Sequence, residues 1–406
     1  MVVLDGVPVN HQILEWARLK AKLSRDLAAQ KAKITPIKRG RDEMMTSSSR
    51  LESWEKGNSK PTYHQLVNIA KAYRRPLLTF FLTEPPRQEI KLLDFRSFPN
   101  KDNDVSFFEA EFSALVRQTE AIQKSVREIL QESEKGTLNF IGSVSLTSNP
   151  NEVAHQIRTT LNYDISNQKR LTSVSNLFSY IRNLAAEHGI YVMVQGNLGS
   201  THTNMFPEIF RGFTLCDRIA PFIVVNPNDT KTANVFTLIH EFCHLWLGDT
   251  GVSNWNSLNI KDSIPASPKE VFCDRVSAEF LVPEHDLIEH WDTLTIGYEK
   301  DIVISRIAQK LKVSPIVIAR RLLEFNKITS DYYWDWYDAY QKEWLTIKEK
   351  LRHAKKEPLS YRIRARNKLG IALISTVLDA TNKGRISEME ASRILNVKIN
   401  NFPRIS

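Results

Sequence analysis

The chain has 406 residues, of which 42% are apolar and 25% are charged, and its formal net charge is +9. This length predicts about two to four domains, and the composition is ordinary for a globular protein with hydrophobic cores. Three cysteines cannot form a disulfide framework, and no uncharged apolar run is long enough to span a membrane. Because the N-terminus also lacks the pattern of a signal peptide, we expect a cytoplasmic protein and no membrane segment.

The excess positive charge is concentrated near the N-terminus. Residues 1–90 contain 16 Lys and Arg and only 9 Asp and Glu, which gives this region a net charge of +7. A basic region of this kind attracts the phosphates of nucleic acid. The charge distribution therefore predicts a nucleic-acid contact in the first quarter of the chain.

Helix signals recur through the same region. The stretch HQILEWARLKAKLSRDLAAQ has apolar residues at helical spacing, and Ser24 is placed to cap a second helix. In SSSRLESWEKGNSKPTYHQLVNIAKAYRRPLLTFFL, serines can cap a short helix, Gly57 ends it and Pro61 opens the next. This succession resembles the helix-turn-helix of the XRE family, and the resemblance implies a DNA-binding module.

An insertion departs from that family's pattern. About a dozen additional residues, near ITPIKRGRDEMM, stand where its second and third helices join by a tight turn that sets the docking geometry. The insertion contains Lys38, Arg39 and Arg41, which either add phosphate contacts or belong to a solvated loop. With Arg50 of the following helix, they are the candidate nucleic-acid-binding residues. We expect residues 1–90 to bind duplex DNA chiefly through its phosphates.

The next segments lead to a predicted β-hairpin. Residues 91–170 read as a helical connector, whose amphipathic stretch SFFEAEFSALVRQTEAIQKSVREIL should pack against the following domain rather than bind a partner. A further helix, a stop at Gly189 and a short strand follow. RGFTLCD and APFIVVN are β-rich runs separated by a polar turn, which predicts a hairpin. Such a hairpin either supplies an edge strand for an extended peptide substrate or is purely structural.

The stretch FTLIHEFCHLWLG contains His240 and His244 inside an apolar helical run. Residues four apart lie on one face of a helix, so both imidazoles can reach one zinc ion. With Glu241 the stretch matches H-E-x-x-H, in which the glutamate takes a proton from metal-bound water and delivers it to the leaving amine. The alternative is a core helix with two hydrogen-bonded histidines. We predict a metal site with Glu241 as the catalytic base.

A second helix completes the predicted site. SPKEVFCDRVSAEFLVP has a serine cap, a proline in its first turn and a proline at its end, and it carries Glu270 and Asp274 on one face. Glu270 can be the third zinc ligand, while Asp274 accepts the N–H on the far side of a ligand histidine. The alternative is an exposed acidic pair, but the helix is otherwise largely apolar, so its acids need partners.

At this point FTLIHEFCHLWLG and EVFCDRVSAEFLVP resemble the ImmA/IrrE family of zinc metallopeptidases, and the similarity extends over residues 170–330. The resemblance implies a cytoplasmic endopeptidase that cleaves a helix-turn-helix repressor and so derepresses genes. It assigns the metal ligands to His240, His244 and Glu270, the catalytic base to Glu241, and the supporting position to Asp274. No motif fixes the oxyanion-stabilising residue, for which Tyr191, His202 and His285 are candidates.

The last quarter of the chain carries weaker signals. IVISRIAQKLKVSPIVIARRLLEF looks like a second helix-turn-helix, which we interpret as structural because similar helices close the peptidase domain in the family. The aromatic stretch DYYWDWYDAYQKEW favours core or interface packing over base stacking. The basic LRHAKKEPLSYRIRARNKLG is expected to be a solvated face, followed by a small helical element.

These patterns predict an α+β, mostly helical protein. The domains expected are an XRE-like helix-turn-helix at 1–90, a helical connector at 91–170, a zincin-like peptidase domain with a small sheet at 171–330, and a helical region at 331–406. We expect one Zn²⁺ per chain and a zinc-dependent endopeptidase that acts on a repressor or another regulatory protein. The alternative is a non-proteolytic DNA- or protein-binding regulator, an antirepressor or antitoxin, that keeps the peptidase fold. Neither the oligomeric state nor the substrate follows from the sequence.

Overall fold

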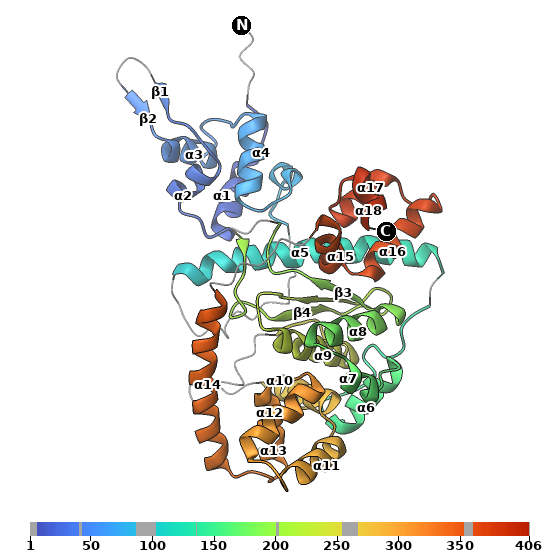
Figure 1. Cartoon of the computed structure of the whole chain (residues 1–406). Helices are drawn as coiled ribbons and strands as arrows, with labels where there is room; N and C mark the ends of the chain where they lie inside the picture. The colour runs from blue at the N-terminus through green and yellow to red at the C-terminus, as the bar shows by residue number, and fades with distance from the viewer. Residues whose placement is uncertain are drawn as a thin grey trace. The chain divides into compact units, whose positions relative to one another are not determined.

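The computed structural model describes residues 6–39, 43–86, 103–134, 136–199, 203–253, 267–352 and 360–405. The protein is α+β and mostly helical, which confirms the predicted fold class (Figure 1). It folds into two compact units, Met1–Gln118 with Asn197–Met205 and Thr119–Gly196 with Phe206–Ser406. Among the described residues, no helix is long and apolar enough to cross a membrane.

The first unit is a bundle of short helices with its own core. The helices are α1 (His11–Lys20), α2 (Arg25–Lys31), α3 (Ser47–Glu55), α4 (Tyr63–Ala72) and the 3₁₀ helix η1 (Leu77–Phe81). Side chains of Asn10, Ser24, Thr46 and Thr62 cap the first four, as the polar residues before each apolar run require. Buried Glu55 pairs with Arg18 at 2.6 Å and with Arg25 at 2.9 Å, and so joins α1, α2 and α3.

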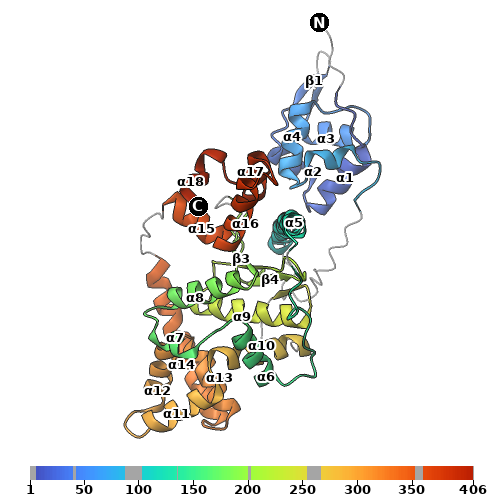
Figure 2. The ribbon, with the colours of Figure 1, turned by 90° about the vertical axis from the view of Figure 1, so that its right-hand side faces the viewer.

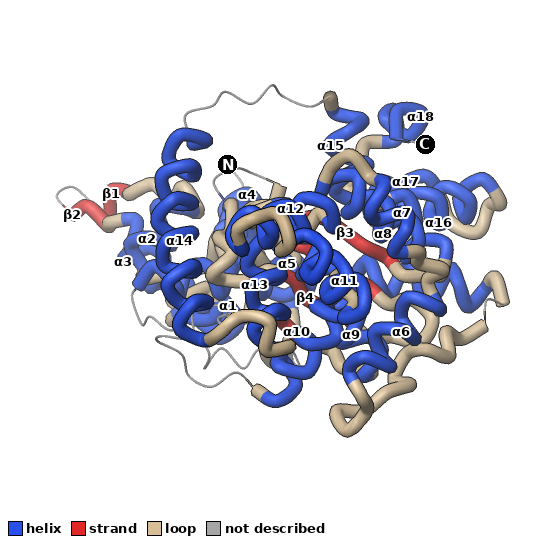
Figure 3. The backbone as a smooth tube through the Cα atoms, turned by 60° about the horizontal axis from the view of Figure 1, so that its bottom comes forward, coloured by secondary structure: helices blue, strands red, loops and turns tan. Residues whose placement is uncertain are grey.

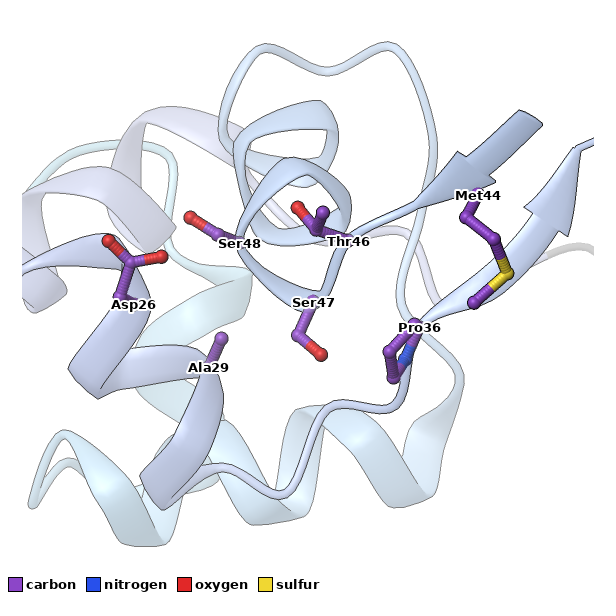
Figure 4. Close-up of a pocket in the computed structure, with 7 residues that line it drawn as sticks. All are labelled: Asp26, Ala29, Pro36, Met44, Thr46, Ser47 and Ser48. Carbon is purple, nitrogen blue, oxygen red and sulfur yellow. The ribbon is translucent and has the colours of Figure 1, made fainter.

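The insertion between α2 and α3 contains a two-stranded hairpin instead of an irregular solvated loop. Strand β1 (Ile37–Arg39) runs antiparallel to β2 (Glu43–Met45), with Lys38 opposite Met44. The hairpin, α2 and the start of α3 border a pocket of about 350 Å³ (Figure 4). Its lining residues are Asp26, Ala29, Pro36, Met44, Thr46, Ser47 and Ser48. Strands β1 and β2 therefore lie between α2 and α3, where the XRE pattern has a tight turn.

The second unit contains the remaining helices, together with the end of α5 (Asn103–Glu132). They are α6 (Pro150–Thr160), α7 (Ile165–Arg170), α8 (Val174–Glu187), α9 (Lys231–Leu247), α10 (Pro268–Leu281), α11 (Glu284–Leu294), α12 (Lys300–Leu311), α13 (Pro315–Glu324) and α14 (Ser330–Arg352). The C-terminal part adds α15 (Tyr361–Leu369), α16 (Ile371–Asn382), α17 (Glu388–Leu395), η4 (Ile399–Asn401) and α18 (Phe402–Ile405).

A four-stranded sheet lies within this unit in the order β3-β5-β4-β6. Its strands are β3 (Tyr191–Val194), β4 (Gly212–Leu215), β5 (Phe222–Val225) and β6 (Gly251–Ser253). The predicted hairpin is confirmed, because β4 runs antiparallel to β5 with Leu215 opposite Phe222. Of the two alternatives for this hairpin, the structure excludes the one in which it supplies an edge strand. Among the described strands, the hairpin occupies the centre and β3 and β6 are the edges, because β6 follows α9 and pairs with β4.

Helices cover both faces of this sheet, so every residue of β4 and β5 is buried. Helices α8 and α9 pack on one face (Figure 2). On the other face, the side-chain amide of Gln123 in α5 donates to the carbonyls of Leu215 at 2.9 Å and Ala220 at 2.8 Å. Helices α15 and α16 contact β3 on that side. Helix α9, which carries H-E-x-x-H, thus packs directly on the central strands of the sheet.

The later helices complete the core around α9 and α10 (Figure 3). Helix α13 buries Ile316, Val317, Ile318 and Leu322. That apolar face is used for packing, so it cannot enter a DNA groove, which agrees with the structural interpretation of this second helix-turn-helix. The aromatic stretch at the start of α14 also packs inward, with Tyr333 buried in the same core.

Candidate metal centre

Helix α9 is the element that positions both histidines. The side chain of Thr230 caps its start, and Gly248, with a φ of 71°, ends it in the left-handed conformation that glycine adopts readily. Between these ends, the run from Val235 to Trp246 is buried throughout. His240 and His244 are therefore held in the protein interior by apolar neighbours on the same helix.

Helix α10 brings a carboxylate to the two histidines. The Nε2 atoms of His240 and His244 lie 3.2 Å apart. The Glu270 oxygens lie 3.1 Å from His240 Nε2 and 3.6 Å from His244 Nε2. Ligand atoms at about 2.0–2.2 Å from a tetrahedral zinc ion lie about 3.3–3.6 Å from one another. The three side chains therefore fit one face of a zinc coordination tetrahedron, and about a quarter of the Glu270 side chain is exposed, which leaves an open side.

Asp274 lies on the far side of His240, where sequence reasoning placed it. Its Oδ1 is 3.0 Å from His240 Nδ1, so Nδ1–H can donate to it and leave Nε2 to face the metal position. Burial lowers the pKa of His240, but hydrogen bonds to Asp274 and Glu270 outweigh it, so the net shift is well upward. Metal must displace that proton when it binds.

A carboxylate beside His244 was missed by the sequence reasoning. Asp249 Oδ2 lies 3.6 Å from His244 Nδ1, an ion-pair separation just beyond hydrogen-bond length. Lys269 Nζ donates to the same oxygen at 2.7 Å. The proximity of His244 lowers the pKa of Asp249 to about 2, with help from Lys269. Each histidine thus has a carboxylate near its outward nitrogen; Asp249 follows α9 so closely that H-E-x-x-H-x₄-D could have indicated it.

Cys273 competes with Glu270 for the role of third ligand. Its thiol and the two imidazoles offer ligand atoms within 4.8 Å of one another, and all three residues are buried. The neighbouring thiol of Cys243 and burial raise the pKa of Cys273, whereas the net pKa shift of Glu270 is downward because its imidazole neighbours outweigh burial. A metal ligand must be deprotonated. Glu270 therefore meets this requirement more readily than Cys273, and it is partly open to solvent.

Glu241 occupies a pocket formed by strand β4. The hydroxyl of Thr214 donates to Glu241 Oε2 at 2.6 Å, and both residues are fully buried. A Cβ atom on Gly212 would lie 2.7 Å from Glu241 Oε1 and 2.7 Å from Thr237 Cγ2. The missing side chain of Gly212 therefore leaves room for the carboxylate, and Thr214 fixes its orientation. Neither role was predicted, because both residues belong to a strand distant in sequence.

The three oxyanion candidates do not converge on this site. Tyr191 on β3 directs its hydroxyl to Thr376 Oγ1 at 3.1 Å and stacks on Phe222, so it is used in packing the C-terminal helices. His202 lies outside the described residues. His285 is exposed at the start of α11. The structure places neither described candidate at the metal centre.

Three of the four predicted nucleic-acid-binding residues lie in the hairpin or in α3, which follows it. Lys38 is exposed on β1, and Arg39 follows it on the same strand. Arg41 lies outside the described residues. The Arg50 guanidinium donates a hydrogen bond to the carbonyl of Thr35, and its Cζ lies 5.3 Å from the centre of the Trp54 ring. Arg50 thus already supports the segment that leads into the hairpin. Lys38 thus remains the clearest free cation of the set within the described part of the first unit.

Comparison with protein families gives a match that covers the candidate metal centre. The family model for the IrrE N-terminal-like domain matches from the end of α8 to the end of α13. The matched segment, residues 185–323, is similar to an IrrE N-terminal-like domain. This domain has a metallopeptidase-type fold and contains both histidine positions and α10. Among curated proteins, none matches the chain. The helix-turn-helix resemblance falls outside the matched segment.

Proposed function

We propose that the protein is a zinc-dependent endopeptidase whose metal ligands are His240, His244 and Glu270. The observation that carries the proposal is the spacing of their ligand atoms, 3.1 to 3.6 Å, with Glu241 buried on the same helix. Zinc bound there would polarise a water molecule and the substrate carbonyl. In the apolar surroundings of α9, the Glu270 carboxylate would offset part of the charge of the zinc ion.

Other residues of the chain would transfer the proton and hold the reacting groups in position. Glu241 takes the proton of the attacking water and delivers it to the leaving amine. Thr214 holds the Glu241 carboxylate through its hydroxyl, so the base needs little reorganisation during the reaction. Asp274 keeps the outward N–H of His240 in place, which fixes the tautomer and ring orientation.

The edge strand β6 is our candidate for substrate binding. It pairs with β4 on one side and, among the described strands, with none on the other. A Cβ atom on Gly251, its first residue, would lie 3.6 Å from the His244 ring, so the strand begins beside the metal centre. An extended peptide could add to this edge through main-chain hydrogen bonds. We propose a regulatory protein as substrate, a helix-turn-helix repressor above all, because the ImmA/IrrE resemblance implies one.

The test of this function is a comparison of cellular proteomes with the wild-type protein and with Glu241→Gln. Gln keeps the shape but cannot accept the proton, so fragments produced only by the wild type identify the substrate. Glu289→Gln makes the same chemical change on the exposed face of α11 and is the matched control. Identical fragment sets from wild type and Glu241→Gln would contradict proteolysis and favour the non-proteolytic regulator.

For the first unit we propose binding of duplex DNA, chiefly through phosphates. The net charge of +7 over residues 1–90 and the basic hairpin support it. Counterion release should give a log K against log salt slope of about −3 to −6, at about −0.9 per phosphate neutralised. Fluorescence anisotropy with labelled duplexes at several salt concentrations measures this slope. Absence of binding at about 50 mM salt and micromolar protein would leave the unit as a protein-docking module.

A further inference from the structure

A second site of a different chemistry lies in the same unit as the metal centre. A cavity of about 840 Å³ opens between the start of α8, the start of α9 and the C-terminal half of α12. Its volume is within the range of about 300–1,000 Å³ that is usual for small-molecule sites. The nearest metal-centre helix contributes Lys231, its first residue, which is nine residues and so about 13 Å of helix from His240. The cavity is therefore separate from the zinc ligands.

The charge of this cavity is one-sided. Its lining includes the four cations Lys231, Arg306, Lys310 and Lys312 and no carboxylate. Within the described residues, no carboxylate lies within ion-pair distance of any of the four. Arg306 stacks on Tyr298 at 3.7 Å, and Lys312 Nζ donates to the carbonyl of Lys310 at 2.9 Å. Lys231, Arg306 and Lys310 are exposed and Lys312 is partly buried, and among the described residues no carboxylate pairs with any of them.

The remaining wall supplies hydrogen-bond donors. Thr172, Ser173 and Ser175 line the cavity at the start of α8. Ser173 Oγ accepts from the backbone amide of Asn176, which leaves its own proton available to a ligand. The first turn of α8 contains no acidic residue, so its positive dipole end is not neutralised from within the helix. Cations and donors thus converge on one concave space from three helices.

Lys312 is the least exposed of the four cations. Lys312 is partly buried, and the removal of water lowers its pKa, because no carboxylate compensates the charge. A bound anion would stabilise the positive charge of Lys312 in place of the water that burial removes. Inorganic chloride is too small to meet four cations around a cavity of this size, whereas a chain of phosphate groups can span them.

We propose that this cavity binds a soluble small molecule that carries two or more phosphate groups and is of nucleotide size. The ligand would link α9, through Lys231, to α12, through Arg306, Lys310 and Lys312. Because α9 carries His240 and Glu241, occupancy would stiffen the helix on which the metal centre is built. Binding of a phosphorylated metabolite in the cavity would thus affect the peptidase domain through α9.

The experiment is calorimetric titration of the zinc-loaded full chain with sodium triphosphate at about 50 mM salt, and of two matched variants. Lys310→Gln with Lys312→Gln removes two charges from the cavity. Lys124→Gln with Lys398→Gln removes two charges from exposed lysines elsewhere in the unit. Since any chelation of zinc by triphosphate affects all three proteins alike, only a difference between the variants counts. Thermal unfolding checks that each variant is folded.

We expect the wild type and the control variant to bind about one triphosphate per chain with a dissociation constant below about 1 mM. The cavity variant should bind about tenfold more weakly, since each partly exposed charge contributes a few-fold. Failure of the wild type to bind, or equal affinity in all three proteins, would overturn the proposal. A cavity variant that keeps triphosphate affinity but loses duplex DNA would overturn it in favour of a nucleic-acid surface.

Discussion

Removal of the Asp274 carboxylate should weaken zinc binding without unfolding the protein. The hydrogen bond from His240 Nδ1 to Asp274 Oδ1 measures 3.0 Å, and the two side chains are only 4% and 18% exposed. A hydrogen bond to a charged group contributes about 1.5–3 kcal/mol. Because about 1.4 kcal/mol is a factor of ten, Asp274→Ala should raise the zinc dissociation constant about 10- to 100-fold, as is usual for residues that support metal ligands.

Competition with a chromophoric chelator measures this constant on the full chain. Asp249→Ala is the internal comparison. The Asp249 carboxylate lies 3.6 Å from His244 Nδ1, its side chain is a third exposed, and it also pairs with Lys269. We expect a smaller loss there, less than about tenfold. An Asp274→Ala protein with wild-type zinc affinity would refute the assignment of Asp274 as the support of His240.

Three further predictions address the catalytic base and the hairpin. Glu241→Gln should keep the fold and the zinc but lower the cleavage rate about 10²- to 10⁴-fold, measured on the substrate found by proteomics. Thr214→Val should lower that rate about 10- to 100-fold through loss of the 2.6 Å hydrogen bond, and Thr214→Ser should recover most of it; wild-type rates in Thr214→Val would show that Glu241 needs no such support. Neutralising Lys38, Arg39 and Arg41 together should flatten the salt dependence of DNA binding by about 1–3 units, and an unchanged slope would remove the hairpin from the interface.

The geometry of the candidate metal centre was the most predictable part of the molecule because its residues lie on two regular helices. An i, i+4 spacing fixes the relative direction of side chains on any helix, so His240 and His244 had to share a face, as did Glu270 and Asp274. The start of α10 was also predictable, because a capping serine and a first-turn proline determine it locally. The helix begins at Pro268. The spacing within each helix therefore followed from the sequence alone.

Features that depend on strand pairing were not predictable in this way. Thr214 and Gly212 reach Glu241 only because β4 lies in the centre of the sheet, and that position depends on β6, a short strand with no clear pattern of its own. The hairpin of the first unit was missed for another reason. Its two strands are only three residues long each, and the basic insertion that contains them has the composition of a loop.

Zinc content is the measurement that tests the central claim most directly. Elemental analysis after zinc-replete purification should give about one Zn²⁺ per chain for the wild type and for Cys273→Ser, and little for Glu270→Ala, because the carboxylate and not the thiol completes the ligand set. Each of the three proteins must first be shown to be folded. Either its thermal unfolding in the presence of zinc or its secondary-structure signal must match that of the wild type. A wild-type protein without metal, or a Glu270→Ala protein that keeps its zinc while Cys273→Ser loses it, would contradict the metal centre described above.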